Sequence, residues 1–514
     1  TSNDFRFLRL WWEVPSEKVM VPDESLAAQE CRDECLEKVD SDGTWCYYSK
    51  IDKASALAAP IHLLVNWGRD GKEIKAYHQG NGDSPSRYVR SETSYFMPGF
   101  SYMLRSSRLV PYCVPRGVIP TAGRSQIYPS TGYENEVLAI ASSNLASAVA
   151  RFKGENFGQP KFQNSMVASI PYSNIDEANL EKIRNKVNEG FVASESKFQQ
   201  DETAIQFNGF LPKQEGGEVK LDRSSLLGRD AEIAIAKSYG LDESELSLLE
   251  LDMMESINSP KWISENENEP DISSKGTSYS EIFLSWAFGV AMGRFDINSY
   301  HNIKKETFVD DPFSPIPSKS PAMLAVDKPK FHKFDGILVE DPAHEHDIVT
   351  LINDVLSAID EYCDVDINKW LKKSFFKTHL REYSKSKRQA PIYWPIQTVS
   401  GSYRLWLYYP ELTNQTLYSC INDFVEPKLL QTTDELYQLR QKQNRTPDED
   451  KDFSSLVAFE IELKDLRDEL LLIAQYWKPN LNDGVQITAA PLWSLFQHKP
   501  WQNKLKKTWQ ESKN

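Results

Sequence analysis

Two short apolar and aromatic runs, at residues 392–398 and 403–409, lie on either side of a Ser-Gly-Ser tripeptide centred on Gly401. A glycine between two such runs is typical of a β-hairpin turn. The same pattern predicts a second hairpin over residues 61–76, with the Gly-Arg-Asp-Gly sequence at 68–71 as its turn. Both segments are therefore expected to form antiparallel strands.

Apolar residues recur at helical spacing in much of the remaining chain. The most apolar of these segments is residues 279–295, in which Gly289 and Gly293 lie one turn apart and would allow another helix to approach closely. Residues 429–443 and 454–477 have leucines at heptad-like spacing on either side of a polar turn, which predicts an antiparallel helical hairpin. The other predicted helices are 134–152, 179–201, 222–240, 347–363 and 365–383.

The order of these elements predicts an α+β fold. We expect a β-rich target-recognition-like domain at 1–176, a helical linker or packing domain at 177–300, a basic helix with a β-hairpin at 301–428, and a C-terminal helical hairpin and tail at 429–514. Residues 265–276 have the composition of a linker.

The composition narrows the class of protein. None of the apolar runs reaches the roughly 18–20 residues that span a bilayer, so we expect no membrane partner. The first residues lack the charged-then-apolar order of a signal peptide, and six cysteines are few for 514 residues. A cytoplasmic protein is the simplest interpretation, and both ends read as those of a fragment.

Charge is distributed unevenly along the chain. The formal net charge is −15, yet residues 369–409 contain nine Lys or Arg against one acid, with ten aromatic residues interleaved. This local excess of positive charge indicates an anionic partner. A nucleic acid, with a phosphate backbone and bases available for stacking on aromatic rings, has the matching chemistry. The candidate contacts are Lys373, Lys377, Lys385, Lys387, Arg388, Tyr403 and Arg404.

A second candidate region, residues 93–133, contains no acidic residue. Loops with arginine and without carboxylates can approach phosphates without repulsion, and Arg is the commonest side chain that reads guanine edges. The candidates are Arg105, Arg108, Arg116 and Arg124. The alternative is that these arginines only solvate a sheet.

Three sequence blocks carry a family resemblance: APIYWPIQTVSGSYRLWLYY with TLYSCINDFVEPKL at 390–429, LNDGVQITAAPLWSLFQHKPWQNKLKKTW at 481–509, and IHLLVNWGRDGKEIKA at 61–76. They resemble the C-terminal part of large adenine-specific DNA methyltransferases of BREX (phage-growth-limitation) defence and of single-chain Type II restriction-modification enzymes. The basic loops, the helix at 134–152 and the segment closing on Ile170-Pro171 resemble the target-recognition domains of such enzymes.

The resemblance implies double-stranded DNA as the partner and S-adenosylmethionine as the cofactor of the parent enzyme. It also implies other defence-system proteins or a methyltransferase domain as further partners. The chain itself has neither the Phe-x-Gly-x-Gly turn nor the Pro-Pro-aromatic loop that amino-methyltransferases use, and residues 311–313, Asp-Pro-Phe, are the nearest imitation. The family's catalytic residues therefore have no counterparts here, and we expect no cofactor in this chain.

Alternative chemistries rest on weaker patterns. Cys31, Cys35 and Cys46 lack a fourth ligand at zinc spacing, and the pair His344 and His346 is typical of a surface segment. A nuclease hypothesis rests only on Asp52 with the Glu-Ile-Lys sequence at 73–75. A protein-interaction module, which would bind a defence partner or a DNA-mimic inhibitor, is favoured by the helical hairpin and by the acidic segment 242–271.

Overall fold

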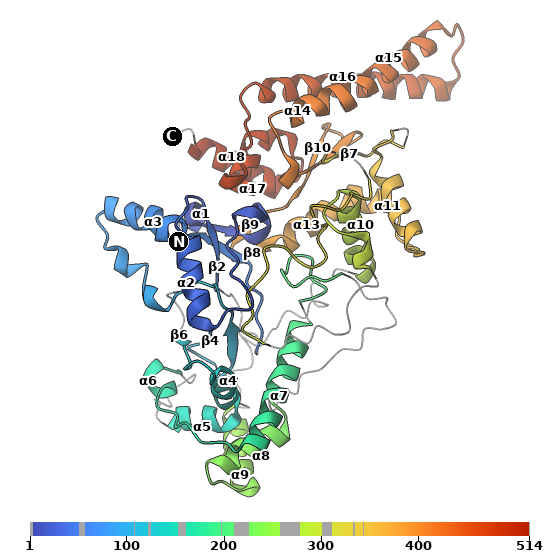
Figure 1. Cartoon of the computed structure of the whole chain (residues 1–514). Coiled ribbons are helices and arrows are strands. Elements are labelled where there is room, and N and C mark those ends of the chain that lie inside the picture. Colours follow the sequence, from blue (N-terminus) through green and yellow to red (C-terminus); the bar gives the residue numbers. More distant parts are fainter. Residues whose placement is uncertain are drawn as a thin grey trace. The chain divides into compact units, whose positions relative to one another are not determined.

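The computed structural model describes residues 4–50, 57–106, 108–121, 125–152, 161–196, 198–209, 226–257, 278–300, 311–332, 335–342 and 344–512 (Figure 1). Small antiparallel sheets are combined with many helices, so the fold is α+β, as predicted. Two compact units are formed. Unit 1 comprises Thr1–Trp11, Ser16–Lys275 and His301–Pro321, and unit 2 comprises Trp12–Pro15, Gly276–Tyr300 and Ala322–Asn514. The finer division into four domains stays a prediction.

The first sheet of unit 1 has the strand order β1-β3-β2, and all pairs are antiparallel. Its strands are β1 (Leu8–Leu10), β2 (Trp45–Tyr48) and β3 (Leu63–Asn66), and the short helix α1 (Asp4–Phe7) leads into it. Helix α2 (Ala28–Lys38) precedes β2.

The predicted hairpin at 61–76 is wrong in its second half, because β3 is followed by helix α3 (Gly68–Gly80). Strand β3 is the central strand, and β1 and β2 already occupy both of its edges. The Gly-Arg-Asp-Gly sequence instead forms a left-handed turn in which Gly71 has a φ of +67° and packs against the Trp67 ring. The helix then places Ile74 and His78, four residues apart, on its inner side.

The second sheet of unit 1 has the order β5-β4-β6, with β4 (Gly99–Tyr102), β5 (Pro111–Val114) and β6 (Ser125–Ile127). Two helices follow, α4 (Glu134–Ser142) and α5 (Asn144–Phe152), where the sequence predicted one. The break lies at Ser143, whose hydroxyl accepts a hydrogen bond from the backbone N–H of Ala146 at 3.1 Å. Ser143 thereby caps the second helix.

The remaining helices of unit 1 are α6 (Asn164–Val167), α7 (Glu177–Glu195), α8 (Arg229–Ser238) and α9 (Glu243–Ile257). Asp176 caps α7 through the backbone N–H of Asn179 at 3.0 Å. A continuous core joins these helices to the second sheet, with Phe100, Leu138, Ile183, Val187 and Ile235 among its members.

The predicted hairpin of unit 2 is confirmed. Strands β10 (Tyr393–Gln397) and β11 (Arg404–Tyr408) pair antiparallel, and β7 (Ile337–Val339) adds to the other edge of β11. Gly401 has a φ of +74° in the turn. Trp394 and Trp406 are fully buried, so this sheet is part of the core of unit 2.

Helices α10 (Tyr279–Ala291) and α11 (Ile348–Ala358) pack on one another within unit 2. Helix α10 begins with a capping box formed by Ser278 and Glu281. Gly289 lies at a close approach, but to side chains outside helices and not to the predicted second helix: a Cβ added there would lie 2.5 Å from the Phe295 ring and 3.0 Å from the Tyr393 hydroxyl.

The predicted helical hairpin is also confirmed (Figure 1, orange). Helix α14 (Thr416–Ser419) precedes α15 (Glu426–Gln441) and α16 (Pro447–Ala474), and α16 starts with a capping box of Thr446 and Glu449. Leu463, Leu466 and Leu470 are buried on its inner side. Helices α17 (Val485–Ala489) and α18 (Lys499–Ser512) complete the unit.

Candidate nucleic-acid interface

One helical segment of unit 2 presents a row of basic side chains to solvent. It consists of α12 (Ile367–Trp370), a π-helical turn (Leu371–Phe375) and α13 (Phe376–Glu382). Asp366 caps it, because its carboxylate accepts a hydrogen bond from the backbone N–H of Lys369 at 3.0 Å. The buried side carries Ile367, Trp370, Leu371, Phe375, Phe376 and Leu380, and the exposed side carries Lys369, Lys372, Lys373, Lys377 and Arg381.

The four lysines of this segment are not neutralised by nearby carboxylates. Within the described part of the chain, they take part in no ion pair. Arg381 differs, since its Nε lies 3.2 Å from Oε1 of Glu382. Four exposed ammonium groups on one helix create a positive potential that attracts anions.

Helix α18 adds a second row of lysines next to the first. The Phe376 ring on α13 contacts the rings of Phe496 and His498, at centroid distances of 6.3 and 5.7 Å. Burial lowers the pKa of His498, and the positive charge of Lys377 lowers it further. The start of α18 therefore lies beside α13.

Helix α18 buries Trp501 and Leu505 and turns Lys499, Lys506 and Lys507 outward. The Nζ of Lys506 lies 4.6 Å from the centroid of the Trp493 ring, within cation–π range. We define the basic surface as the exposed lysines of both helical segments: Lys369, Lys372, Lys373, Lys377, Lys499, Lys506 and Lys507.

The α18 lysines were missed as site residues by sequence reasoning, which placed the basic region at 369–409. A signal was present. Trp501, Leu505 and Trp509 recur every fourth residue, and the positions between them are polar and include three lysines. The pattern predicts a helix with a basic outer face, but it does not say that this face adjoins α13.

The basic cluster at 385–388 forms a tight two-stranded hairpin, with β8 (Ser384–Lys385) and β9 (Arg388–Gln389). Ser386 and Lys387 occupy the turn with φ values of 51° and 65°. Lys387 is exposed and Lys385 is partly buried. Arg388 is only 5% exposed and its side chain pairs with Glu13, so its assignment to a DNA-contacting surface is corrected.

Tyr403 and Arg404 are likewise inside unit 2, which removes them from the predicted contact surface. Tyr403 is 2% exposed and donates its hydroxyl proton to the carbonyl of Phe424 at 3.0 Å. Arg404 is 7% exposed, and its Nη1 lies 2.7 Å from Oε1 of Glu340. Both side chains therefore make contacts within unit 2, next to the sheet formed by β10, β11 and β7.

Most aromatic residues of the basic region 369–409 are also buried, among them Tyr393, Trp394 and Trp406. They form the core beneath the lysines and are not available for base stacking. Two rings on or next to α18 remain partly exposed, Trp493 and Trp509, and Trp509 stacks on Tyr476 at a centroid distance of 5.9 Å. The positive charge, rather than the aromatic content, therefore supports a phosphate-binding role.

In unit 1 the predicted arginines do not form one group. The register pairs Tyr102 with Pro111 and Gly99 with Val114, so the loop bearing Arg105 and Arg108 lies at the opposite end of the β4–β5 pair from Arg116. Arg105 is exposed and Arg108 is partly buried.

Arg116 has a structural partner in unit 1. Its Nη1 lies 2.7 Å from Oδ2 of Asp311, and its side chain is 12% exposed. Arg124 lies outside the described residues. Among the predicted arginines that the structure describes, Arg105 is thus the most exposed.

Among the described residues, the side chains of the nuclease and metal-site hypotheses are not brought together. Asp52 lies outside the described residues, and Glu73 and Lys75 form separate contacts, with Arg6 and with Asp70 and Glu92. The three cysteines of the N-terminal region are buried. Among the described residues, no group of three or more His, Cys, Asp or Glu side chains is placed to hold a metal ion.

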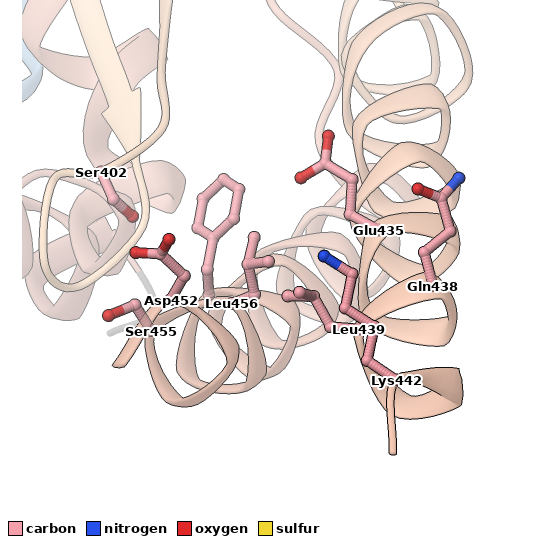
Figure 2. Close-up of a pocket in the computed structure, with 9 residues that line it drawn as sticks. Ser402, Glu435, Gln438, Leu439, Lys442, Asp452, Ser455 and Leu456 are labelled. Atoms are coloured by element: carbon pink, nitrogen blue, oxygen red, sulfur yellow. The ribbon is translucent and has the colours of Figure 1, made fainter. Parts of the chain in front are cut away.

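An open pocket of about 620 Å³ lies between α15, α16 and the β10–β11 turn (Figure 2). Leu439 and Leu456 contribute apolar lining, and Glu435 and Asp452 contribute carboxylates from the two helices. Carboxylates repel phosphate, so this pocket is not part of the candidate interface.

No protein-family model matches the chain, and no curated protein matches it. Within the described ranges, no helix combines the length and the apolar character needed to cross a lipid bilayer.

Proposed function

We propose that this chain is the DNA-recognition portion of a site-specific adenine-N6 DNA methyltransferase in phage defence, of the BREX or restriction-modification type. The resemblance of residues 390–429 and 481–509 motivates the enzyme class. The observation that carries DNA binding is the basic surface, seven exposed lysines on two adjoining helices of unit 2 in a chain of net charge −15. Catalysis would belong to a domain with the motifs that this sequence lacks.

The two units would contribute differently. Lysines on the basic surface would neutralise backbone phosphates without regard to sequence. Reading of base edges would fall to the acid-free loops of unit 1, where Arg105 is exposed. Affinity and specificity would thus be separable by substitution.

The decisive measurement is a salt titration of binding to random-sequence duplex DNA. Each neutralised phosphate lowers affinity about 3.5-fold between 50 and 200 mM salt, because the slope of log K against log[salt] is about −0.9 per contact. With six contacts the affinity falls on the order of 10³-fold. An affinity that hardly changes with salt contradicts the proposal.

Substitution localises the contacts. Replacing Lys373 and Lys377 together by Ala is expected to make the salt slope shallower by about 2 and to weaken binding to all sequences alike. The matched control replaces Lys451 and Lys464, two exposed lysines of α16, and should leave the slope unchanged. Equal losses in both double variants would indicate diffuse attraction rather than an interface.

The absence of the cofactor motifs gives a second check. We expect the purified chain to bind DNA without binding S-adenosylmethionine, which can be measured by calorimetry on the same preparation. Cofactor binding would place a methyltransferase site within this chain and contradict the assignment.

A second function, a protein-interaction module of a defence complex, is favoured by the outer face of the helical hairpin. Leu430, Tyr437 and Leu472 are 65%, 63% and 61% exposed on α15 and α16. If these side chains form one contiguous apolar patch, the patch would be typical of a docking surface. Binding of an acidic DNA-mimic protein through the same lysines, without binding of duplex DNA, would favour this function over the first.

A further inference from the structure

A buried cluster of charges lies where the N-terminal segment of unit 2, the β8–β9 hairpin and α18 meet. The Nε of Arg388 is 3.4 Å from Oε2 of Glu13, and these side chains are 6% and 1% exposed. The other carboxylate oxygen of Glu13 accepts a hydrogen bond from the backbone N–H of Val485 at 3.0 Å. Both oxygens of this carboxylate are therefore engaged.

Lys504 on α18 is the third charged member of this cluster. Its Nζ donates a hydrogen bond to Oε1 of Gln389 at 3.0 Å and lies 6.0 Å from the centroid of the Trp501 ring. Within the described part of the chain, Lys504 makes no ion pair. The charges of Arg388 and Glu13 both act on Lys504.

The buried surroundings and the nearby charge of Arg388 change the protonation of Lys504. Burial lowers the pKa of its ammonium to about 8, and the neighbouring charge of Arg388 acts in the same direction. Glu13 opposes the shift, while its two carboxylate oxygens are engaged by Arg388 and by the backbone N–H of Val485. The charged groups that face Lys504 are therefore one cation on β9 and one carboxylate on the 12–15 segment.

A negative charge bound beside Lys504 would offset the positive charges of Arg388 and Lys504. The lysines around Lys504 suit a phosphate group. The Lys504 side chain is partly exposed, Lys506 and Lys507 follow it on α18, and Lys387 is exposed in the turn next to β9. These groups extend the basic surface from α13 and α18 to the β8–β9 turn.

We propose that Lys504 contacts one phosphate of the DNA backbone where α18 meets the β8–β9 turn, and that it takes up a proton when this phosphate is bound. The inference rests on the proposed DNA-binding function of unit 2. It adds to the interface a cation whose charge depends on whether phosphate is bound.

Proton uptake on binding makes the affinity depend on pH. If the bound phosphate returns Lys504 to between about 9 and its ordinary value of about 10.4, the affinity falls about five- to tenfold between pH 7 and pH 9. The loss occurs as pH rises, because free Lys504 must then acquire a proton that it no longer holds.

The test measures duplex affinity at pH 7, 8 and 9 at constant ionic strength for the full chain and two variants. Lys504→Arg keeps a permanent charge, so its affinity should be nearly independent of pH. Lys504→Met removes the charge and should bind more weakly at pH 7, also without pH dependence. A matched control, Lys451→Arg on α16, lies outside the basic surface and should keep the wild-type profile. Equal pH profiles in wild type and Lys504→Arg overturn the inference.

A second readout follows the lysine itself. Acylation of amines at several pH values, quantified residue by residue by mass spectrometry, should follow the titration of Lys504 near pH 8, and added duplex should raise the pH at which Lys504 reacts. Failure to bind duplex at pH 7 and 50 mM salt removes the proposed function and this inference together. Binding with an unchanged Lys504 reactivity profile removes the inference alone.

Discussion

Arg388 and Glu13 form a buried ion pair with an Nε–Oε2 distance of 3.4 Å, which ties the β8–β9 hairpin to the segment 12–15 of unit 2. Glu13 belongs to a short stretch that leaves unit 1 to join the second unit. Arg388 lies in a basic stretch that suggests a DNA contact, but its side chain forms an ion pair inside unit 2.

The first prediction concerns this pair. Glu13→Ala leaves the Arg388 guanidinium buried without its carboxylate, and we expect a loss of about 3–5 kcal/mol in the free energy of unfolding. The backbone N–H of Val485 also loses its acceptor. Urea unfolding followed by tryptophan fluorescence measures the change.

The matched control is Glu17→Ala, since Glu17 is exposed in the neighbouring 3₁₀ turn (Ser16–Lys18). Substitution at an exposed site of this kind should change stability by no more than about 0.5 kcal/mol. Similar losses at Glu13 and Glu17 would show that the pair contributes little.

Gly289 provides the second prediction. A Cβ at this position would lie 2.5 and 2.7 Å from two carbons of the Phe295 ring and 3.0 Å from the hydroxyl of Tyr393. Gly289→Ala should therefore destabilise unit 2 by about 1–3 kcal/mol, although Ala favours helices. Gly80→Ala is the control, because a Cβ there meets nothing within 4 Å. A stabilised Gly289→Ala variant would contradict the tight packing of α10.

Glu195 at the end of α7 gives a prediction about pH. Burial raises the pKa of its carboxyl to about 7, so folded Glu195 stays protonated between pH 4.5 and 7, where the unfolded chain has released the proton. Its stabilising contribution is complete below pH 4.5 and is lost as pH rises through 7.

Glu195→Gln should remove this dependence, and its stability advantage over wild type should grow by up to about 3 kcal/mol from pH 5 to pH 8. Thermal or urea unfolding at both pH values measures it. Glu181→Gln, at an exposed position on the same helix, should show no such growth. An advantage that is equal at the two pH values would place the Glu195 carboxyl in water.

Local patterns predicted the elements that depend on neighbours in sequence. The hairpin around Gly401, the apolar helix α10 and the helical hairpin of α15 and α16 follow from periodicity, turn residues and capping residues. The helix after β3 was mispredicted because the decisive fact is not local: β1 and β2 occupy both edges of that strand.

The same distinction applies to the candidate site. Lys373 and Lys377 were predicted because residues 369–409 concentrate basic residues in an acidic chain. Burial of Arg388 and Arg404 depends on Glu13 and Glu340, which lie far away in sequence. The contribution of α18 depends likewise on the contact between Phe376 and Phe496.

The final prediction separates base reading from structural support in unit 1. Arg105 is exposed beyond the Tyr102 end of β4, whereas Arg116 is paired with Asp311 at the other end. Arg105→Ala should change the preferred DNA sequence, with a cost of about 1–3 kcal/mol at the best site and a salt slope altered by no more than about 1. Selection of bound duplexes from a random-sequence library, followed by affinity measurements, tests this.

Two further variants make the outcome specific. Arg116→Ala leaves the Asp311 carboxylate without its partner, so it should lower the stability of unit 1 and leave the selected sequence unchanged. Arg87→Ala removes an arginine whose side chain is 71% exposed and should alter neither property. If the three variants select the same sequence as wild type, base reading does not reside in the acid-free loop at 103–110, and the arginines of unit 1 serve only its surface and packing.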